Sequence, residues 1–483
     1  GSTVDFVASG TLPNGKPVVL KSDGTVEVVA DSRTADSIPA GSETVFNATT
    51  TYETSVSFDP NTANKFVIAY KDGGNLSYGH AIVGTVSGTS ISFGSEYVFN
   101  SASTKFPSIT FDPNTANKFV IAYKDAGNSG RGTAIVGTAS GTTLSFGSEY
   151  VFNSAATTDT VTSFDPNTAG KFVVVYGDDG NSNYGTAIVG TVSGTSISFG
   201  SEVVFNGDIW GVSLSFDPNT ANKFVVAYRD HSNLGQGTAI VGTVSGTSVS
   251  FGTEVIFNTG VSHQISVSFD PNTAGQCVLA YKDYGNSAYG TVIVGTVSGT
   301  SVSFGTTVVF NSGTSSYNSL SFDPNTIGEF VVAYKDDSNS SYGTAIVGTM
   351  AGTSISFGAE YVFNTGSTDY ISTYFDPNTT GKFVIAYKDV GNFAYGAAVL
   401  GQLGVSNTNL TATNFVGITT EAIADTATGS ITLQGGLSTN QTGLTIGSTY
   451  YAQGDGTIST VSTAPAINIG KALSATTLLL KDL

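Results

Sequence analysis

An internal repeat constrains this chain more than any other feature of its sequence. The string Phe-Asp-Pro-Asn-Thr begins at seven positions, spaced by 53 residues or once by 52: Phe58, Phe111, Phe164, Phe216, Phe269, Phe322 and Phe375. A second string, Val-Phe-Asn or Ile-Phe-Asn, occurs seven times with the same period. Because repeats of this kind bury their apolar faces against their neighbours, the fold must be a stack or a ring of similar units.

One unit of the repeat reads as four short strands separated by turn residues. In the first unit the predicted strands cover residues 54–58, 66–70, 81–86 and 91–99. The second of these is apolar at consecutive positions, which predicts burial on both of its faces. No segment of the unit has a helical period. A four-stranded antiparallel meander of this length is the size of one propeller blade.

The two ends of the repeat array predict how it closes. The seventh unit supplies three strands, up to about residue 403, but no fourth strand follows. Residues 38–47 align without a gap on residues 91–100, which hold the fourth strand of the first unit. We therefore expect an all-β protein with a seven-bladed β-propeller over residues 38–404, four antiparallel strands per blade, closed by the N-terminal strand. Closure leaves no unprotected sheet edge.

The segments outside the repeats, residues 1–37 and 405–483, resemble each other. Residues 15–26 and 447–458 share their spacing and an Asp-Gly hairpin signal. Because ring closure brings the two ends of the array together, we expect the flanks to form one small β-module. Its last apolar segment, residues 472–480, is expected to be a buried strand or an assembly contact.

Charge and composition exclude several classes of partner. The chain has 18 Lys and Arg against 36 Asp and Glu, a net charge of -18, so nothing in it suits a run of nucleic-acid phosphates. No apolar run reaches the roughly 18 residues that a membrane span requires, and we expect no membrane insertion. The single cysteine, Cys277, stands where other units have a strand-two Phe and is expected in the core.

The sequence offers little for catalysis. It contains three histidines, His80, His231 and His263, and none of the usual phosphate-loop, zinc or nucleophile motifs. We therefore expect a protein that is not an enzyme and that holds no cofactor.

An Asp-x-x-Asn pair follows the second strand of every unit. We interpret it as a turn tie, in which the side chains bond backbone amides. Calcium coordination is the alternative, although one pair offers few ligands. In the first three units the pairs are Asp72 and Asn75, Asp125 and Asn128, and Asp178 and Asn181.

Comparison between the units indicates where a ligand would bind. Strand direction alternates, so the first and third turns of each unit share one face, while the second turn and the crossing loop to the next unit share the other. The first face is almost identical in all units and the second varies. Its candidate residues are Tyr52, Phe106, Trp210, His263, Tyr317 and Tyr370 in crossing loops, with Arg131 and Gln236 at the start of two third strands. Rings on a rigid scaffold suit stacking on sugars or anchoring a protein interface.

Two sets of segments resemble proteins of marine bacteriophages. Residues 414–418 (Asn-Phe-Val-Gly-Ile), 431–436 and 470–474 resemble a module of virion structural and tail-fibre proteins, and the repeat strings resemble repeats in proteins of uncultured marine phages. The resemblance implies a location in the virion, where the flanking module contacts other virion proteins and the propeller contacts a host-surface glycan or protein. It implies no catalytic residue.

The sequence leaves three hypotheses of function open. The first is host attachment by the propeller, and the second is a purely structural decoration or fibre-joint protein with no host ligand. The third is a carbohydrate-active propeller enzyme. Whether the chain forms a homo-oligomer is also left open.

Overall fold

The computed structural model describes residues 3–30, 35–404, 408–411, 413–454, 456–460, 462 and 466–481. The protein is all-β and divides into two compact units. One comprises Asp36–Leu403, and the other combines Gly1–Ala35 with Gly404–Leu483. No helix in the described parts of the chain is both long enough and apolar enough to cross a membrane.

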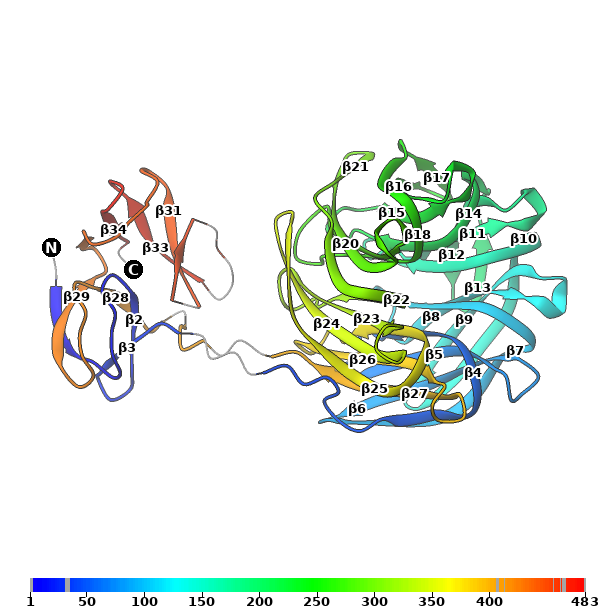
Figure 1. Ribbon diagram of the computed structural model, residues 1–483, viewed down its shortest axis with the longest axis horizontal. Coiled ribbons are helices and arrows are strands. Elements are labelled where there is room, and N and C mark those ends of the chain that lie inside the picture. Colours follow the sequence, from blue (N-terminus) through cyan, green and yellow to red (C-terminus); the bar gives the residue numbers. More distant parts are fainter. Residues whose placement is uncertain are drawn as a thin grey trace. The chain divides into compact units, whose positions relative to one another are not determined.

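The larger unit is a closed succession of antiparallel strands that follow one another around a ring (Figure 1). Long linking strands pass from one sheet to the next: β4 (Thr44–Phe58), β7 (Ser90–Phe111), β10 (Thr143–Phe164), β14 (Val203–Phe216), β18 (Val255–Phe269), β22 (Val308–Phe322) and β25 (Ser354–Phe375). The second strands are β5 (Lys65–Asp72), β8 (Lys118–Asp125), β11 (Lys171–Asp178), β15 (Lys223–Asp230), β19 (Gln276–Asp283), β23 (Glu329–Asp336) and β26 (Lys382–Asp389). The third strands are β6 (Tyr78–Ser87), β9 (Arg131–Ser140), β12 (Tyr184–Ser193), β16 (Gln236–Ser245), β20 (Tyr289–Ser298), β24 (Tyr342–Ala351) and β27 (Tyr395–Gln402).

Short elements complete the ring. Within residues 35–404, three units have a separate outer strand, β13 (Ser196–Phe199), β17 (Ser248–Phe251) and β21 (Ser301–Phe304). Four second turns contain a 3-10 turn, η1 (Ala126–Asn128), η2 (Asp179–Asn181), η3 (His231–Asn233) and η4 (Tyr284–Asn286).

The N-terminal strand closes the ring, as the alignment of residues 38–47 predicts. β27 pairs with β4, with Ala397 opposite Val45. The hydroxyl of Tyr387 on β26 donates to Glu43 Oε2 at 2.6 Å, which repeats the Tyr-to-Glu bond of five other units. The strand order therefore returns to its start without a free edge in this unit.

The second strands form the centre of the core. Phe66 to Tyr70 of β5 are fully buried, as their unbroken apolar run predicts. The facing strand needs glycine at one position, because a Cβ on Gly84 would lie 2.1 Å from the Phe66 ring. Cys277 replaces this phenylalanine in the fifth unit and is fully buried, in agreement with its predicted place in the core.

Hydrogen bonds between neighbouring units repeat with the period of the sequence. The Ile109 N–H donates to Ser55 Oγ at 3.1 Å, and across the closure the Val56 N–H donates to Ser372 Oγ at 3.1 Å. At the Asp-Pro-Asn-Thr turns, an Asp carboxylate accepts from the backbone of an adjacent unit, as in the bond from Asn64 N to Asp376 Oδ2 at 3.0 Å. These bonds explain why this face is almost the same in every unit.

The crossing segments are strand, and the prediction that they form loops was wrong. In each linking strand the first half pairs with a third strand. The second half pairs with the next second strand. The Ser- and Thr-rich sequence suggested loops, but pairing on both sides satisfies the backbone. A bulge interrupts each pairing at one residue with positive φ: Glu53, Phe106, Asp159, Gly211, Gln264, Tyr317 and Tyr370.

The smaller unit contains two five-stranded sheets among its described residues. The first has the order β1 (Thr3–Val7), β29 (Thr428–Leu433), β28 (Phe415–Thr419), β2 (Pro17–Leu20) and β3 (Val26–Val28), so it joins both ends of the chain. The second has the order β30 (Leu437–Ser438), β34 (Leu478–Leu480), β33 (Ala466–Ala472), β31 (Thr449–Gln453) and β32 (Ile458–Ser459). The two predicted hairpins are β2–β3 and β31–β32; Asp455 of the second turn lies outside the described residues.

Candidate ligand-binding site

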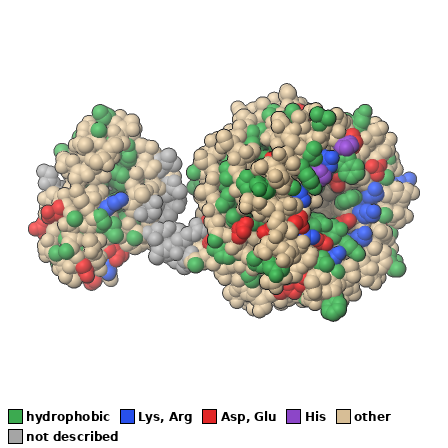
Figure 2. Space-filling model, viewed as in Figure 1, with side chains coloured by type: hydrophobic (Ala, Val, Ile, Leu, Met, Phe, Trp, Pro, Cys, Tyr) green, Lys and Arg blue, Asp and Glu red, His purple; other side chains and the backbone are tan. Residues whose placement is uncertain are grey.

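The inner halves of the linking strands surround a central channel. One end of it is a cavity of about 390 Å³, lined by the Phe and Pro of the seven Phe-Asp-Pro-Asn-Thr strings and by Tyr374. The bulges lie at the other end of the same strand halves. Figure 2 shows Lys, Arg and His side chains gathered beside the hollow in the face of the ring.

We call this other end the mouth, and define it by the seven bulge residues and the cross-strand pair that precedes each bulge. The pairs are Tyr52–Lys71, Lys105–Lys124, Thr158–Gly177, Trp210–Arg229, His263–Lys282, Ser316–Lys335 and Asp369–Lys388. The second member of each pair directly precedes the Asp that begins the second turn, and in six units it is Lys or Arg.

Bulge residues bond one another across the units. Glu53 Oε2 accepts from the Phe106 N–H at 2.7 Å, and Asp159 Oδ2 accepts from the Gly211 N–H at 2.8 Å. Burial raises the pKa of both carboxyl groups above their ordinary values. A side-chain oxygen of one unit therefore holds the bulge of the next.

Three of the predicted rings form one cluster in the mouth. The ring centres of Tyr317 and Tyr370 lie 5.1 Å apart, and those of Tyr370 and Tyr52 lie 6.0 Å apart. The ammonium of Lys388 lies 4.3 Å from the Tyr52 ring centre, and that of Lys71 lies 5.2 Å from it. Two ammonium groups therefore lie close to the ring of Tyr52, which is one of the rings predicted to stack on a sugar.

Ion pairs border this cluster on the side of the sixth unit. Lys335 Nζ lies 3.0 Å from Asp369 Oδ1 and 3.7 Å from an oxygen of Asp337. Lys282 Nζ lies 3.8 Å from the other Asp337 oxygen. Since Lys282 belongs to the fifth unit, the charged contacts run across three successive units of the mouth.

A second group of rings lies in the fourth and fifth units. His263 contacts the Tyr284 ring at 4.9 Å between centres, and its Nε2 is 2.8 Å from Arg229 Nη1. Burial and the Arg229 charge lower the pKa of His263. Trp210 is 47% exposed and meets His231 edge-on at 6.4 Å, so it offers a ring surface to a ligand. His263 lies in β18 and not in the predicted loop.

The remaining predicted residues have other surroundings. Phe106 is a half-buried bulge residue at the mouth. Arg131 donates to Ser154 O at 3.2 Å and to Asn128 Oδ1 at 3.3 Å, and Gln236 donates to Thr259 O at 3.4 Å. Arg131 and Gln236 therefore fasten a second turn to a crossing segment and are not joined to the ring clusters by these bonds.

The Asp-x-x-Asn pairs act within their turns. Asp125 Oδ1 accepts from the N–H groups of Gly127 and Asn128 at 3.0 and 3.2 Å, and Asp72 and Asp178 accept from their own turns in the same way. These bonds support the turn-tie interpretation for the Asp residues. The Asn side chains have other partners: Asn75 Nδ2 lies 3.1 Å from His80 Nε2, and Asn128 Oδ1 accepts from Arg131.

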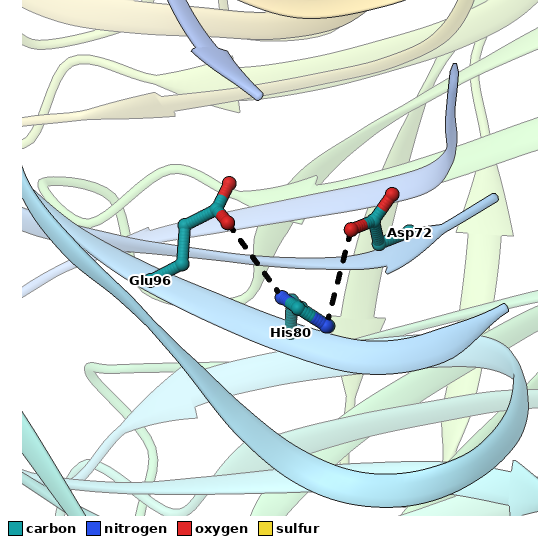
Figure 3. Close-up of side chains that lie close together, drawn as sticks. All are labelled: Asp72, His80 and Glu96. Atoms are coloured by element: carbon teal, nitrogen blue, oxygen red, sulfur yellow. Dashed lines mark ion pairs between the residues drawn. The ribbon is translucent and has the colours of Figure 1, made fainter. Parts of the chain in front are cut away.

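A cluster that the sequence did not reveal surrounds His80 (Figure 3). Its Nε2 lies 3.9 Å from Asp72 Oδ2, and its Nδ1 lies 3.9 Å from Glu96 Oε2. These three residues are close enough together to hold a metal ion. However, Asp72 faces Nε2 and Glu96 faces Nδ1. A metal ion binds an imidazole through a single ring nitrogen, so an ion bound to His80 would face only one of the two carboxylates. The signal in the sequence was that His80 replaces the Thr of five other units.

Sequence reasoning also missed the basic residues of the mouth and the acidic bulge residues. The recurring Tyr-Lys-Asp string was visible, but it became informative only when the register placed Lys71 and its equivalents opposite the variable residues.

Comparisons with known proteins identify the fold and no family. No family model and no curated protein matches the chain. Among solved structures, the lectin BP39L from Burkholderia pseudomallei matches with a TM-score of 0.54 and 9% identity, over 75% of this chain and 99% of its own. Sqt1 from Chaetomium thermophilum matches with a TM-score of 0.47 and 12% identity, over 77% of this chain and 91% of its own.

Proposed function

We propose that residues 36–403 form a seven-bladed β-propeller that binds a glycan at the mouth without catalysing a reaction. The observation that carries the proposal is the contrast between the two ends of the ring. The Asp-Pro-Asn-Thr end repeats the same side chains and uses them to join units. The mouth presents different aromatic and charged residues in each unit on the same rigid strands, which is typical of a binding surface.

The structural comparison supports the fold in this proposal. BP39L is a lectin, and almost its whole length matches the chain. At 9% identity, no binding residue is transferred from it. The choice of a glycan over a protein ligand rests on this chain's own mouth, where rings alternate with hydroxyl, amide and charged groups.

The location that we propose is the surface of a phage particle, where the propeller would attach to a host and the smaller unit would contact other virion proteins. This part of the proposal rests on the resemblance of the C-terminal segments and repeat strings to marine phage proteins.

A glycan array with the purified chain tests the proposal. We expect binding by the wild type and a loss of about 2 kcal/mol, roughly thirtyfold, in Trp210→Ala, because exposed tryptophans often dominate binding surfaces. The control is Thr89→Ala, which changes an exposed residue at the opposite face. If Trp210→Ala leaves binding intact and Thr89→Ala abolishes it, the binding site lies at the end of the ring opposite the mouth.

The structural and enzymatic hypotheses predict different results with the same purified chain. A protein that binds no glycan on the array fits the purely structural role. Shortened oligosaccharides after incubation with a host polysaccharide would show that the propeller is an enzyme.

A further inference from the structure

We propose that the glycan is acidic, and that its carboxylate or sulfate group binds beside the Tyr52 ring to the ammonium groups of Lys71 and Lys388. The inference rests on the proposed glycan-binding function and names the class of glycan. It starts from two cations that the structure brings to the same tyrosine ring.

The position of Lys388 is unusual for a lysine. The residue is only 9% exposed, and its Nζ lies 4.3 Å from the ring centre of Tyr52 and 5.7 Å from that of Tyr370. Lys71 Nζ approaches the Tyr52 ring to 5.2 Å. The negative ring faces favour both ammonium groups, but a neutral ring supplies no counter-charge.

The carboxylates nearby make their short contacts with other groups. Asp369 stands opposite Lys388 in the sheet register, yet its Oδ1 lies 3.0 Å from Lys335. Glu53 follows Tyr52 in the chain and accepts from the Phe106 N–H; burial raises the pKa of its carboxyl group, while the charges of Lys71 and Lys105 oppose this rise. Among the described residues, no carboxylate oxygen lies within 4.0 Å of either ammonium.

The electrostatics of the mouth favour an anion at this point. Burial lowers the pKa of Lys388, and the charge of Lys335 adds to this effect while the charge of Asp369 opposes it, so the charged form is held at a net cost. An anionic group bound to these ammonium groups would relieve this cost through charge-assisted hydrogen bonds. The chain as a whole carries a net charge of -18, so two neighbouring cations without a salt bridge contrast with the acidic character of the protein.

The surrounding groups suit a sugar that carries the anion. Tyr370, beside Lys388, and Tyr317, which packs against Tyr370, are half-buried and offer apolar surface to the ring of the sugar. Carboxylate and sulfate share the chemistry that two ammonium groups recognise, so the geometry assigns an anionic sugar without choosing between them.

The test measures binding of three labelled oligosaccharides to the full chain: an oligouronate from alginate, a sulfated oligosaccharide from carrageenan, and a neutral oligosaccharide from dextran. We expect the wild type to bind one or both acidic probes at least tenfold more tightly than the neutral one. Which acidic probe binds distinguishes carboxylate from sulfate. Binding should weaken as salt increases.

Two variants test the residues separately. Lys388→Met and Lys71→Met keep most of the apolar stem and remove the charge, and each should weaken binding of the acidic probe at least tenfold. The matched control is Lys223→Met, which removes the same charge at the opposite end, where Lys223 bonds Thr243. Lys71 is half-exposed, so its variant tests the site even if Lys388→Met fails to fold.

The outcomes separate this inference from the proposed function. If the neutral probe binds as well as the acidic ones, or if both lysine variants bind the acidic probe normally, the acidic-glycan inference is wrong and glycan binding stands. If the wild type binds glycans of no kind, both proposals fail.

Discussion

Thr307→Glu should stabilise the protein by supplying a hydrogen bond that one unit lacks. In six units the strand-two tyrosine donates to a glutamate near the start of the linking strand or just before it, as Tyr334 does to Glu360 at 2.6 Å. The fifth unit has Thr307 at the equivalent position. The Tyr281 hydroxyl is therefore buried without a hydrogen-bond partner.

The magnitude follows from the environment of the two groups. A buried unpaired hydroxyl costs about 1–3 kcal/mol, and a hydrogen bond to a charged group contributes about 1.5–3 kcal/mol. Residue 307 is exposed, so a glutamate there keeps its hydration and loses some side-chain freedom on bonding. We expect a net gain of about 1–2 kcal/mol in the free energy of unfolding, or a rise in Tm of about 2 °C.

Thermal melting of four variants tests whether Thr307→Glu acts through the Tyr281 hydroxyl. Thr306→Glu adds the same charge at the neighbouring exposed residue and should leave Tm unchanged. Tyr281→Phe removes the unpaired hydroxyl and should be neutral or slightly stabilising, and Thr307→Glu added to it should bring no further gain. The reasoning fails if Thr307→Glu raises Tm equally with and without the Tyr281 hydroxyl.

Three further predictions concern closure, pH and metal. Deleting residues 1–48 removes three of the four β4 residues that pair with β27, so the chain should melt at a lower temperature and associate in light scattering; an unchanged monomeric melt would contradict closure by this strand. Burial raises the pKa of Glu53, so its contribution to stability is present below about pH 4 and is lost as the pH rises through the raised value. Glu53→Gln, which copies Gln264 in the fifth unit, should therefore gain in Tm over the wild type as the pH rises from 4 to 7, whereas a pH-independent difference would refute this. EDTA should leave Tm unchanged because the Asp of the Asp-x-x-Asn pair accepts from a backbone amide in six units, and a fall that calcium reverses would restore the calcium alternative.

Much of the fold was accessible from the sequence because the repeat multiplies weak signals. The unbroken apolar run at Phe66–Tyr70 predicted a strand buried on both faces, and the orphan segment at residues 38–47 predicted the closing pair. The continuity of the linking strands was not accessible. Their polar composition reflects side chains that bond neighbouring units, such as Ser55, and composition alone does not distinguish this from a loop.

The candidate site was predictable only in part. Variation between units located the mouth and picked out Tyr52, Trp210 and Tyr370. What these rings contact depends on cross-strand register and on the approach of neighbouring units, as the two ammonium groups at Tyr52 show. Arg131 was selected because it departs from the unit pattern, but its bonds fasten a turn.

The bonds between bulges have a consequence for how such rings diversify. The acceptor is a side chain of one unit, as in Glu53, while the donor is the backbone N–H of the next, as in Phe106. The bond therefore places no demand on the identity of the residue that donates. Because the opposite end joins units through side chains that hardly vary, the joints at that end would stay intact if a unit were exchanged, duplicated in place of another or moved around the circle. Recombination among near-identical coding segments would then reshuffle the mouth's chemistry while the scaffold stays foldable.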